Sequence, residues 1–487
     1  MIGIVRYMKT IYKQTILTMA ALFLAAFNTK AVVFTNLYNF SALVSATNRD
    51  GASPYAGLFW SSNFLYGTAY QGGTNGNGTV FKVNADGTGF TNLHNFSVLV
   101  SATNYDGVNP FASLVFSSNS LYGTTQQGGK NGNGAIFKVN TDGTGFTNLY
   151  SFSKLAFGTN SDGYFISSGM VLSSNAITLY GTAELGGTNG NGSVFRINTD
   201  GTSFTNLHSF TFTSIIGNTN TDGANPVAKL TLSGNTLYGT TYGGGGGGNG
   251  AVFKVNTDGT GFTNFYNFTS IINNNTNTDG ANPQAVLVLS GNTLFGTTQH
   301  GGSGGEGTVF KVNTDGTQFT NLYSFTALLS AKNSDGANPK AGLVLLGNAL
   351  YGTTPLGGSG GQGTVFKVNN DGTQFTNLYN FTALNNNTNS DGAAPTADLT
   401  LSGNSLYGTT PMGGSGGSGT LFALILPLPN LNIQLISSAA VLTWTNSNFT
   451  LQTAPVVTGS YTNIPGANSP YTNAIIGSQK FFRLQAN

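Results

Sequence analysis

Carboxylate and imidazole side chains, which carry most acid–base chemistry in proteins, occupy few and mostly repeated positions in this chain. The 487 residues include 16 Asp and Glu and three His. Seven aspartates lie in Asn-x-Asp-Gly segments: Asp50, Asp106, Asp162, Asp222, Asp279, Asp335 and Asp391. Six more lie in shorter Asp-Gly turns: Asp86, Asp142, Asp200, Asp258, Asp315 and Asp371. An Asp before Gly in a turn typically accepts hydrogen bonds from local backbone N–H groups, so the sequence predicts a structural role for these carboxylates.

The other titratable residues form no catalytic pattern. Glu184, Glu306 and Asp398 lie in three different parts of the chain, whereas a glycosidase needs two carboxylates at a defined separation. His94 and His208 stand where equivalent segments have tyrosine, which indicates packing. No Ser-His-Asp arrangement and no cluster with metal-ligand spacing stands out. The sequence therefore assigns no catalytic residue and no metal site.

One weak calcium motif is an alternative for three of the aspartates. The segments at 218–223, 275–280 and 387–392 read N-T-N-[ST]-D-G, similar in spacing to a calcium loop. Each has one carboxylate, amides in place of the others, and no bidentate glutamate after it. Turn capping and a calcium site at Asp222, Asp279 and Asp391 both remain open, and no other cofactor is predicted.

A long tandem repeat must position these residues. Variants of F-T-N-L-Y-N-F begin at Phe34, Phe90, Phe146, Phe204, Phe262, Phe319 and Phe375, at intervals of 56 to 58 residues. In the unit Leu230–Phe268 the pattern predicts four strands, at 230–232, 236–241, 251–256 and 262–268. Gly-Asn and Asp-Gly supply the tight turns between them. No segment after the N-terminal region has a helical period.

Four antiparallel strands per unit are typical of a propeller blade, so we predict an all-β, seven-bladed β-propeller. The chain enters with an isolated fourth-type strand, Phe34–Phe40, and leaves with three strands, Leu399–Leu424. If the N-terminal strand completes the last blade, the ring closes without an exposed edge. A β-solenoid is the rival architecture. The strand order resembles that of kelch repeats, although the kelch tryptophan is absent.

The repeated motifs resemble one known family. L-Y-G-T-T, G-G-x-x-G-x-G-T-V-F-K-V-N-x-D-G-T-x-F-T-N-L-Y-x-F and N-x-D-G-A-N-P are similar to the GloVer (Gloeobacter–Verrucomicrobium) tandem repeat of secreted bacterial proteins, from Phe34 to about Leu424. The resemblance implies an exported, repeat-built protein that often carries a C-terminal sorting or anchoring segment. It implies no catalytic residues.

The two ends of the chain have different compositions. Residues 1–31 predict a cleaved signal peptide, with a basic start, an apolar run from Thr15 to Phe27 and a small-residue cleavage site; a retained membrane anchor is the alternative. Residues 32–425 are the predicted propeller, 426–432 a Pro-containing linker and 433–487 a small β-sandwich-like module for sorting or attachment. No membrane span is predicted after signal removal.

Charge excludes one class of partner. The predicted signal holds four of the 18 Lys and Arg residues and none of the 16 Asp and Glu residues. The rest of the chain therefore has a net charge of 14 − 16 = −2. No basic patch for nucleic acid follows from this balance. Only 7% of the residues are charged, which is instead typical of a secreted or cell-surface protein.

The loops that join strand two to strand three and strand four to strand one should share one face, which we call the long-loop face. Variation between repeats marks positions that the fold does not dictate. Aromatic and amide groups mixed there suit stacking on, and hydrogen bonding to, a sugar or peptide, or are ordinary variable loop residues. The predicted ligand-binding residues are Tyr55, Tyr70, Gln71, Phe111, Gln126, Gln127, Glu184, Tyr242, Gln299, His300 and Lys340.

Three functions fit this sequence. The first is a non-catalytic binding or adhesion protein whose partner is a polysaccharide or a protein of the cell surface. The second is a structural or assembly propeller. The third is an extracellular carbohydrate-active enzyme, which would depend on Glu184, His300 or Glu306. Fold alone does not choose between them.

Overall fold

The protein is described by a computed structural model. The described residues are 31–272, 275–427, 431–436, 439–444, 449–474 and 480–486. Except for Ala31, the predicted signal peptide lies outside them, as do residues 428–430 of the predicted linker. The chain forms two compact units: one comprises 35–400 and 407–423, and the other comprises 424–487 with 401–406 and the described residues up to Phe34.

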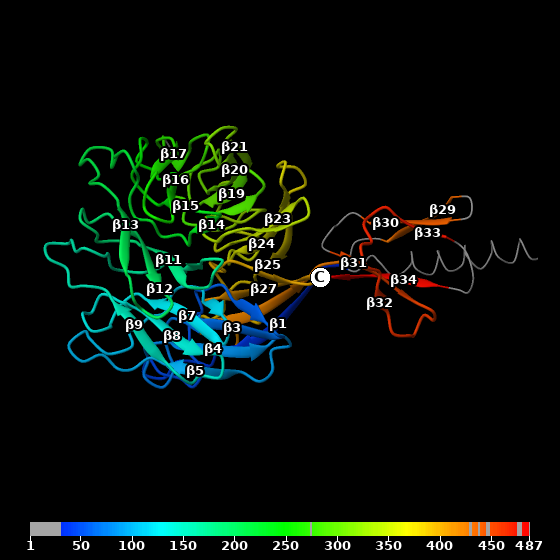
Figure 1. The fold of residues 1–487 in the computed structure, drawn as a ribbon, viewed down its shortest axis with the longest axis horizontal. Helices are drawn as coiled ribbons and strands as arrows, with labels where there is room; N and C mark the ends of the chain where they lie inside the picture. The colour runs from blue at the N-terminus through cyan, green and yellow to red at the C-terminus, as the bar shows by residue number, and fades with distance from the viewer. Residues whose placement is uncertain are drawn as a thin grey trace, which may run out of the picture. The chain divides into compact units, whose positions relative to one another are not determined.

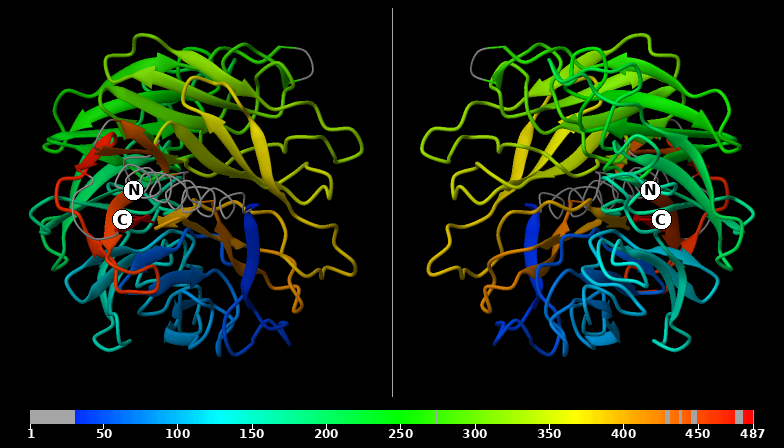
Figure 2. Two further views of the ribbon diagram at one scale, coloured as in Figure 1. Left: turned by 90° about the vertical axis from the view of Figure 1, so that its right-hand side faces the viewer. Right: turned by 90° about the vertical axis from the view of Figure 1, so that its left-hand side faces the viewer.

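The described residues form strands and no α-helix, as predicted for an all-β protein. Repeated four-stranded antiparallel sheets give a propeller-like arrangement, which follows the colour order from blue to orange around a common centre in Figure 2. Figure 1 labels the strands.

In order along each sheet, the first four repeats are β2(Phe59–Ser61)-β3(Phe64–Ala69)-β4(Thr79–Asn84)-β5(Thr91–Asn95), β6(Val115–Ser117)-β7(Ser120–Thr125)-β8(Ala135–Asn140)-β9(Thr147–Ser151), β10(Val171–Leu172)-β11(Thr178–Ala183)-β12(Ser193–Asn198)-β13(Thr205–Ser209) and β14(Thr231–Ser233)-β15(Thr236–Thr241)-β16(Ala251–Asn256)-β17(Thr263–Asn267). The remaining repeats are β18(Val288–Ser290)-β19(Thr293–Thr298)-β20(Thr308–Asn313)-β21(Thr320–Ser324), β22(Val344–Leu346)-β23(Ala349–Thr354)-β24(Thr364–Asn369)-β25(Thr376–Asn380) and β26(Thr400–Ser402)-β27(Ser405–Thr410)-β28(Thr420–Ile425)-β1(Val33–Asn39).

The strands of the unit 230–268 agree with the sequence prediction to within one residue at each end. Strand four pairs with strand three, but the pairing is interrupted by a register shift between Val252 and Phe253. Such a bulge bends the strand and increases its twist. The same shift occurs in the equivalent strand pair of the other repeats for which pairing is described.

Aromatic side chains join successive sheets and explain the repeated F-T-N-x-Y-x-F motif. The ring of Tyr266 stacks on Phe319 of the next repeat, at 4.0 Å between centroids and 6° between planes. Phe268 is fully buried and meets Phe310 edge-on. The glycine of L-Y-G makes room for a further ring, that of Phe253, since a Cβ on Gly239 would lie 2.5 Å from the Phe253 Cζ. One repeat alone could not bury these faces.

The N-terminal strand β1 belongs to the last repeat. In the other repeats an Asn on strand four donates to a backbone carbonyl 43 or 45 residues earlier, as Asn92 does to Arg49. The equivalent Asn36 on β1 donates to the carbonyl of Ser390, 354 residues later. Trp60 also stacks on Tyr407 at 5.3 Å, so the first and last repeats pack together.

The C-terminal unit contains two three-stranded sheets. One has the order β29(Asn432–Ile436)-β30(Ala439–Thr443)-β33(Tyr471–Ala474), and the other β32(Thr462–Asn463)-β31(Phe449–Ala454)-β34(Phe481–Ala486). Side chains from both sheets share one apolar core with Trp444.

Candidate functional site

One position just before strand one of each repeat defines the candidate site; it follows a Pro in every repeat except the third, where it follows Ile166. We call these positions the mouth ring: Tyr55, Phe111, Ser167, Val227, Gln284, Lys340 and Thr396. All are partly exposed, while the Ala or Ser that follows each of them is buried. This alternation shows that the mouth-ring residues turn away from the packed interior of the sheets.

Three of the predicted aromatic residues form a cluster in the first two repeats, which we call the aromatic cluster. Tyr55 and Phe111 stack with centroids 5.1 Å apart. Tyr70, directly after β3, meets both rings edge-on at 5.6 and 5.9 Å. Partial burial, with Tyr55 nearby, raises the pKa of Tyr70. The three rings together present apolar edges and faces beside a phenolic hydroxyl.

A polar cluster occupies the mouth ring of the fifth and sixth repeats. Asn338 is its centre, because its side-chain N–H₂ lies 3.1 Å from the Glu306 Oε2 and 3.4 Å from the His300 Nδ1. The same amide donates to the backbone carbonyl of Gln299 at 3.0 Å. The side chains of Gln284 and Gln299 hydrogen-bond to each other.

Burial shifts the titration of this polar cluster. It raises the pKa of Glu306, an effect partly offset by hydrogen bonds that include the one from Asn338. Burial also lowers the pKa of His300, and the nearby Lys340 lowers it further. The pKa of Lys340 is itself lowered by burial. All three shifts are in the direction that favours the neutral form of the group.

The remaining predicted site residues stand apart from these clusters. The Glu184 Oε2 accepts a hydrogen bond from Ser167 at 2.6 Å, and burial raises the pKa of Glu184. Gln126 is buried, whereas Gln71 and Gln127 are exposed. Tyr242 is partly exposed. The structure therefore brings together Tyr55, Tyr70 and Phe111 in one group, and Gln299, His300 and Lys340 in another.

The aspartates of Asn-x-Asp-Gly are engaged by the protein. Asp279 accepts hydrogen bonds from the Tyr266 hydroxyl and from the backbone N–H and hydroxyl of Thr269. Asp222 and Asp391 have equivalent partners. Within the described ranges no group of three or more His, Cys, Asp and Glu residues could hold a metal ion. Calcium at these aspartates stays a prediction.

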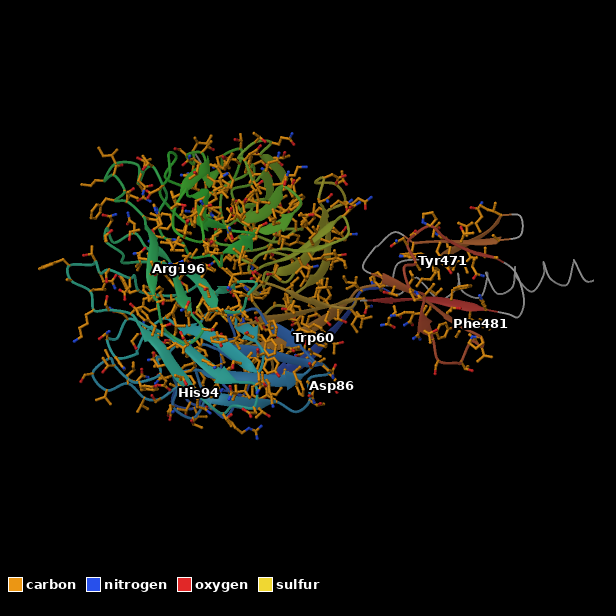
Figure 3. All side chains as sticks on the ribbon, in the orientation of Figure 1. Trp60, Asp86, His94, Arg196, Tyr471 and Phe481 are labelled. Atoms are coloured by element: carbon orange, nitrogen blue, oxygen red, sulfur yellow. The ribbon has the colours of Figure 1, made fainter. Side chains whose placement is uncertain are left out.

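The shorter Asp-Gly turns have the predicted capping geometry. The Asp86 Oδ1 accepts from the backbone N–H of Thr88 at 2.9 Å and from its hydroxyl at 2.7 Å (Figure 3 labels Asp86). The hydrogen bond from the Thr88 hydroxyl has the largest effect and lowers the pKa of Asp86, and the bond from the Thr88 backbone N–H lowers it further.

His94 and His208 replace tyrosine in function as well as in position. The His94 Nε2 lies 2.9 Å from the Asp106 Oδ2, and its ring stacks on Phe146 at 3.7 Å. His208 has the same relationship with Asp222 and Phe262. Both histidines are therefore packing residues that also hold a loop aspartate.

Sequence reasoning missed a second ring, two residues beyond the mouth ring. We call it the axial ring: Gly57, Ser113, Gly169, Lys229, Val286, Gly342 and Asp398. Its members approach one another, since a Cβ on Gly169 would lie 2.7 Å from the Ser113 Oγ and 3.4 Å from the Lys229 Cδ. A Cβ on Gly342 would lie 2.4 Å from the Val286 Cγ1 and 3.0 Å from the Asp398 Oδ1.

The signal for this ring was present in the sequence. Between the Ala or Ser and the Leu or Met that precede strand one, the repeats vary from glycine to lysine and aspartate while their neighbours hardly change. Variation between repeats was used for the loops but not for this position.

The fold and these two rings define a class, the all-β tandem-repeat proteins of propeller-like construction. The family model of the Gloeobacter/Verrucomicrobia repeat matches residues 25–220, 95–274, 155–327 and 268–438. The chain belongs to this family, which confirms the resemblance drawn from the motifs. No curated protein matches the chain.

Several solved structures are similar in backbone only. A puromycin-hydrolyzing peptidase of Mycobacterium tuberculosis aligns at a TM-score of 0.46 and 11% identity, over 85% of this chain and 62% of that one. An oligogalacturonate lyase in complex with manganese aligns at 0.44 and 11%, over 82% and 97%. TolB from Acinetobacter baumannii aligns at 0.36 and 13%, over 63% and 60%. Among the described residues, no helix is long and apolar enough to cross a membrane.

Proposed function

We propose that this protein is an exported, non-catalytic binding or adhesion protein that holds a polysaccharide on its long-loop face. In this proposal the seven repeated sheets are the blades of a closed β-propeller completed by β1, and the two C-terminal sheets are a small β-sandwich used for attachment. The single observation that carries the ligand assignment is the aromatic cluster. Partly exposed rings at a mouth lined by amides are the usual means of holding a sugar, because C–H faces stack on rings and hydroxyls bond to amides.

The test is a binding screen of the purified protein against immobilised glycans and polysaccharides. A variant with Tyr70, Gln126 and Tyr242 changed to alanine is the comparison, and Tyr105→Ala, which removes an exposed tyrosine outside the aromatic cluster, is the matched control. We expect saturable binding that the triple variant loses and the control keeps. Absence of binding to every glycan would overturn the proposal.

A second candidate function, protein assembly, is favoured by a different observation. The connections between strand four and strand one carry exposed apolar side chains in most repeats: Val44, Val100, Phe157, Ile215, Ile272 and Leu329. Phe157 and Ile215 are fully exposed. Apolar groups gathered on one face often mark protein contact sites.

Sedimentation of the purified protein tests this candidate. Assembly through the loop tips predicts concentration-dependent association that Phe157→Ser with Ile215→Ser abolishes, while Val456→Ser, at an exposed apolar position in the C-terminal unit, leaves it unchanged. A monomer at all concentrations, with no protein partner captured through these loops, would remove this candidate.

A further inference from the structure

The axial ring carries two opposite charges among otherwise small or apolar residues. Its members other than Lys229 and Asp398 are glycine, serine or valine. Both charged residues are partly exposed.

The two charges are not equally satisfied. The Asp398 Oδ1 accepts the backbone N–H of Gly342 at 2.5 Å. Asp398 and Lys229 attract each other through space, but no contact joins them as an ion pair. Over the ranges that the structure describes, the Lys229 ammonium has no hydrogen-bond acceptor. An ammonium without a protein acceptor finds its hydrogen-bond acceptors in water or in a ligand.

The mouth ring repeats this imbalance. Lys340 is partly buried, and its ammonium has no hydrogen-bond or ion-pair partner in the described part of the chain. The carboxylates near the mouth all have donors: Glu306 has Asn338, and Glu184 has Ser167. Within the described residues the two ammonium groups therefore lack an acceptor, which a ligand that carries carboxylates would supply.

We propose that the polysaccharide held by the long-loop face is a polyuronate, whose sugar carboxylates bind Lys340 at the mouth ring and Lys229 at the axial ring. This proposal rests on the proposed function and names its ligand class. A carboxylate suits both lysines because a charge-assisted hydrogen bond is roughly twice as strong as a neutral one. Within one repeat, two residues of extended chain separate the two rings, a rise of about 7 Å.

The opposing groups fit the same ligand. Asp398, which attracts Lys229 through space, can accept hydrogen bonds from sugar hydroxyls. The aromatic cluster of the first two repeats offers rings for stacking to the same chain. A neutral polysaccharide would satisfy the rings and the amides but would leave both ammonium groups without an acceptor.

The experiment is calorimetric titration of the purified full chain with polygalacturonate, alginate, fully methyl-esterified polygalacturonate and a neutral β-glucan. The ester keeps the sugar and its linkage and removes only the charge. We expect at least one polyuronate to bind ten times or more as tightly as the ester and the glucan. Raising the salt concentration should weaken this binding, since screening acts on charge pairs.

Lysine variants test whether Lys229 and Lys340 bind the polyuronate. Lys229→Met and Lys340→Met each remove a charge with little change in volume, and Lys311→Met removes an equally partly buried lysine from β20. We expect tenfold or greater loss of polyuronate binding for the first two and less than twofold for the control. If Lys229→Met fails to fold, Lys340→Met and the comparison of acid with ester still decide.

Each outcome separates the two proposals. Binding of the glucan or the ester as tight as that of the acid would overturn the polyuronate proposal and leave the polysaccharide proposal standing. Polyuronate binding unaffected by both lysine variants would overturn the assignment of the lysines. Binding of no polysaccharide at all would overturn both proposals.

Discussion

The Nε2 of His94 lies 2.9 Å from the Oδ2 of Asp106, at the position where five other repeats place a tyrosine hydroxyl against the equivalent aspartate. The long loop between strand four and strand one is held at its base by this bond. His94→Tyr should therefore keep the bond and change the melting temperature little. His94→Phe should lower stability by about 1–3 kcal/mol, because Asp106 loses a partner while it stays buried.

Thermal melting monitored by circular dichroism checks this pair of variants. His208→Tyr and His208→Phe should repeat the result at Asp222 in another repeat. Equal melting temperatures for the Phe and Tyr variants would show that the ring contact with Phe146 or Phe262, and not the bond, stabilises the loop.

Acid should destabilise the protein through these aspartates. Burial alone would raise the pKa of Asp106, but hydrogen bonds from His94 and Ser97 outweigh it and lower the pKa below its ordinary value. A lowered folded-state pKa contributes stability above the unfolded-state pKa, near 3.9, and that stability is lost as the pH falls through the folded value.

We therefore expect the contribution of Asp106 to the melting temperature to be constant above about pH 5. Below about pH 4 the melting temperature should fall steeply. The Asp106→Asn variant, which melts lower at neutral pH, should show a shallower fall in this acid range. A variant curve parallel to that of the native protein down to pH 2 would contradict the assignment.

Close packing of the axial ring should make its glycines sensitive to a single methyl group. In Gly342→Ala the new Cβ would meet the Val286 Cγ1 at 2.4 Å, and overpacking of this kind costs about 1–3 kcal/mol. Val286→Ala removes the opposing atoms. The double variant should therefore be more stable than the sum of the single effects predicts, which is the sign of direct contact.

Melting temperatures of the native protein, both single variants and the double variant complete this cycle. Gly234→Ala is a control, because a Cβ there meets nothing within 4 Å, although its positive φ of 56° adds some backbone strain. Additive effects of Gly342→Ala and Val286→Ala would mean that the two repeats do not touch at the axial ring.

The polar cluster gives a direct test of the enzymatic alternative. Glu306 has a raised pKa and His300 a lowered one, a combination that acid–base catalysts share. We expect no new reducing ends and no unsaturated products when bound polysaccharides are incubated with the protein. Products that appear with the native protein and vanish with both Glu306→Gln and His300→Asn would instead establish catalysis at this cluster.

Much of the fold is readable from local pattern. The four strands of a repeat, the Asp-Gly turns and the membership of β1 in the last sheet follow from alternation, turn chemistry and the count of strand types at the two ends. The capping of Asp86 by Thr88 is equally local, because both residues belong to one turn.

For the candidate site too, the sequence specifies one part and the tertiary structure decides the rest. The sequence by itself determined which positions vary between repeats, and Tyr55, Tyr70, His300 and Lys340 are among them. Only the tertiary structure decided which side chains meet: Tyr55 with Phe111 across two repeats, and Asn338 with Glu306. The physical reason is that a repeat specifies its own hydrogen bonds within some 57 residues, whereas the ring sets contacts between equivalent positions of different repeats.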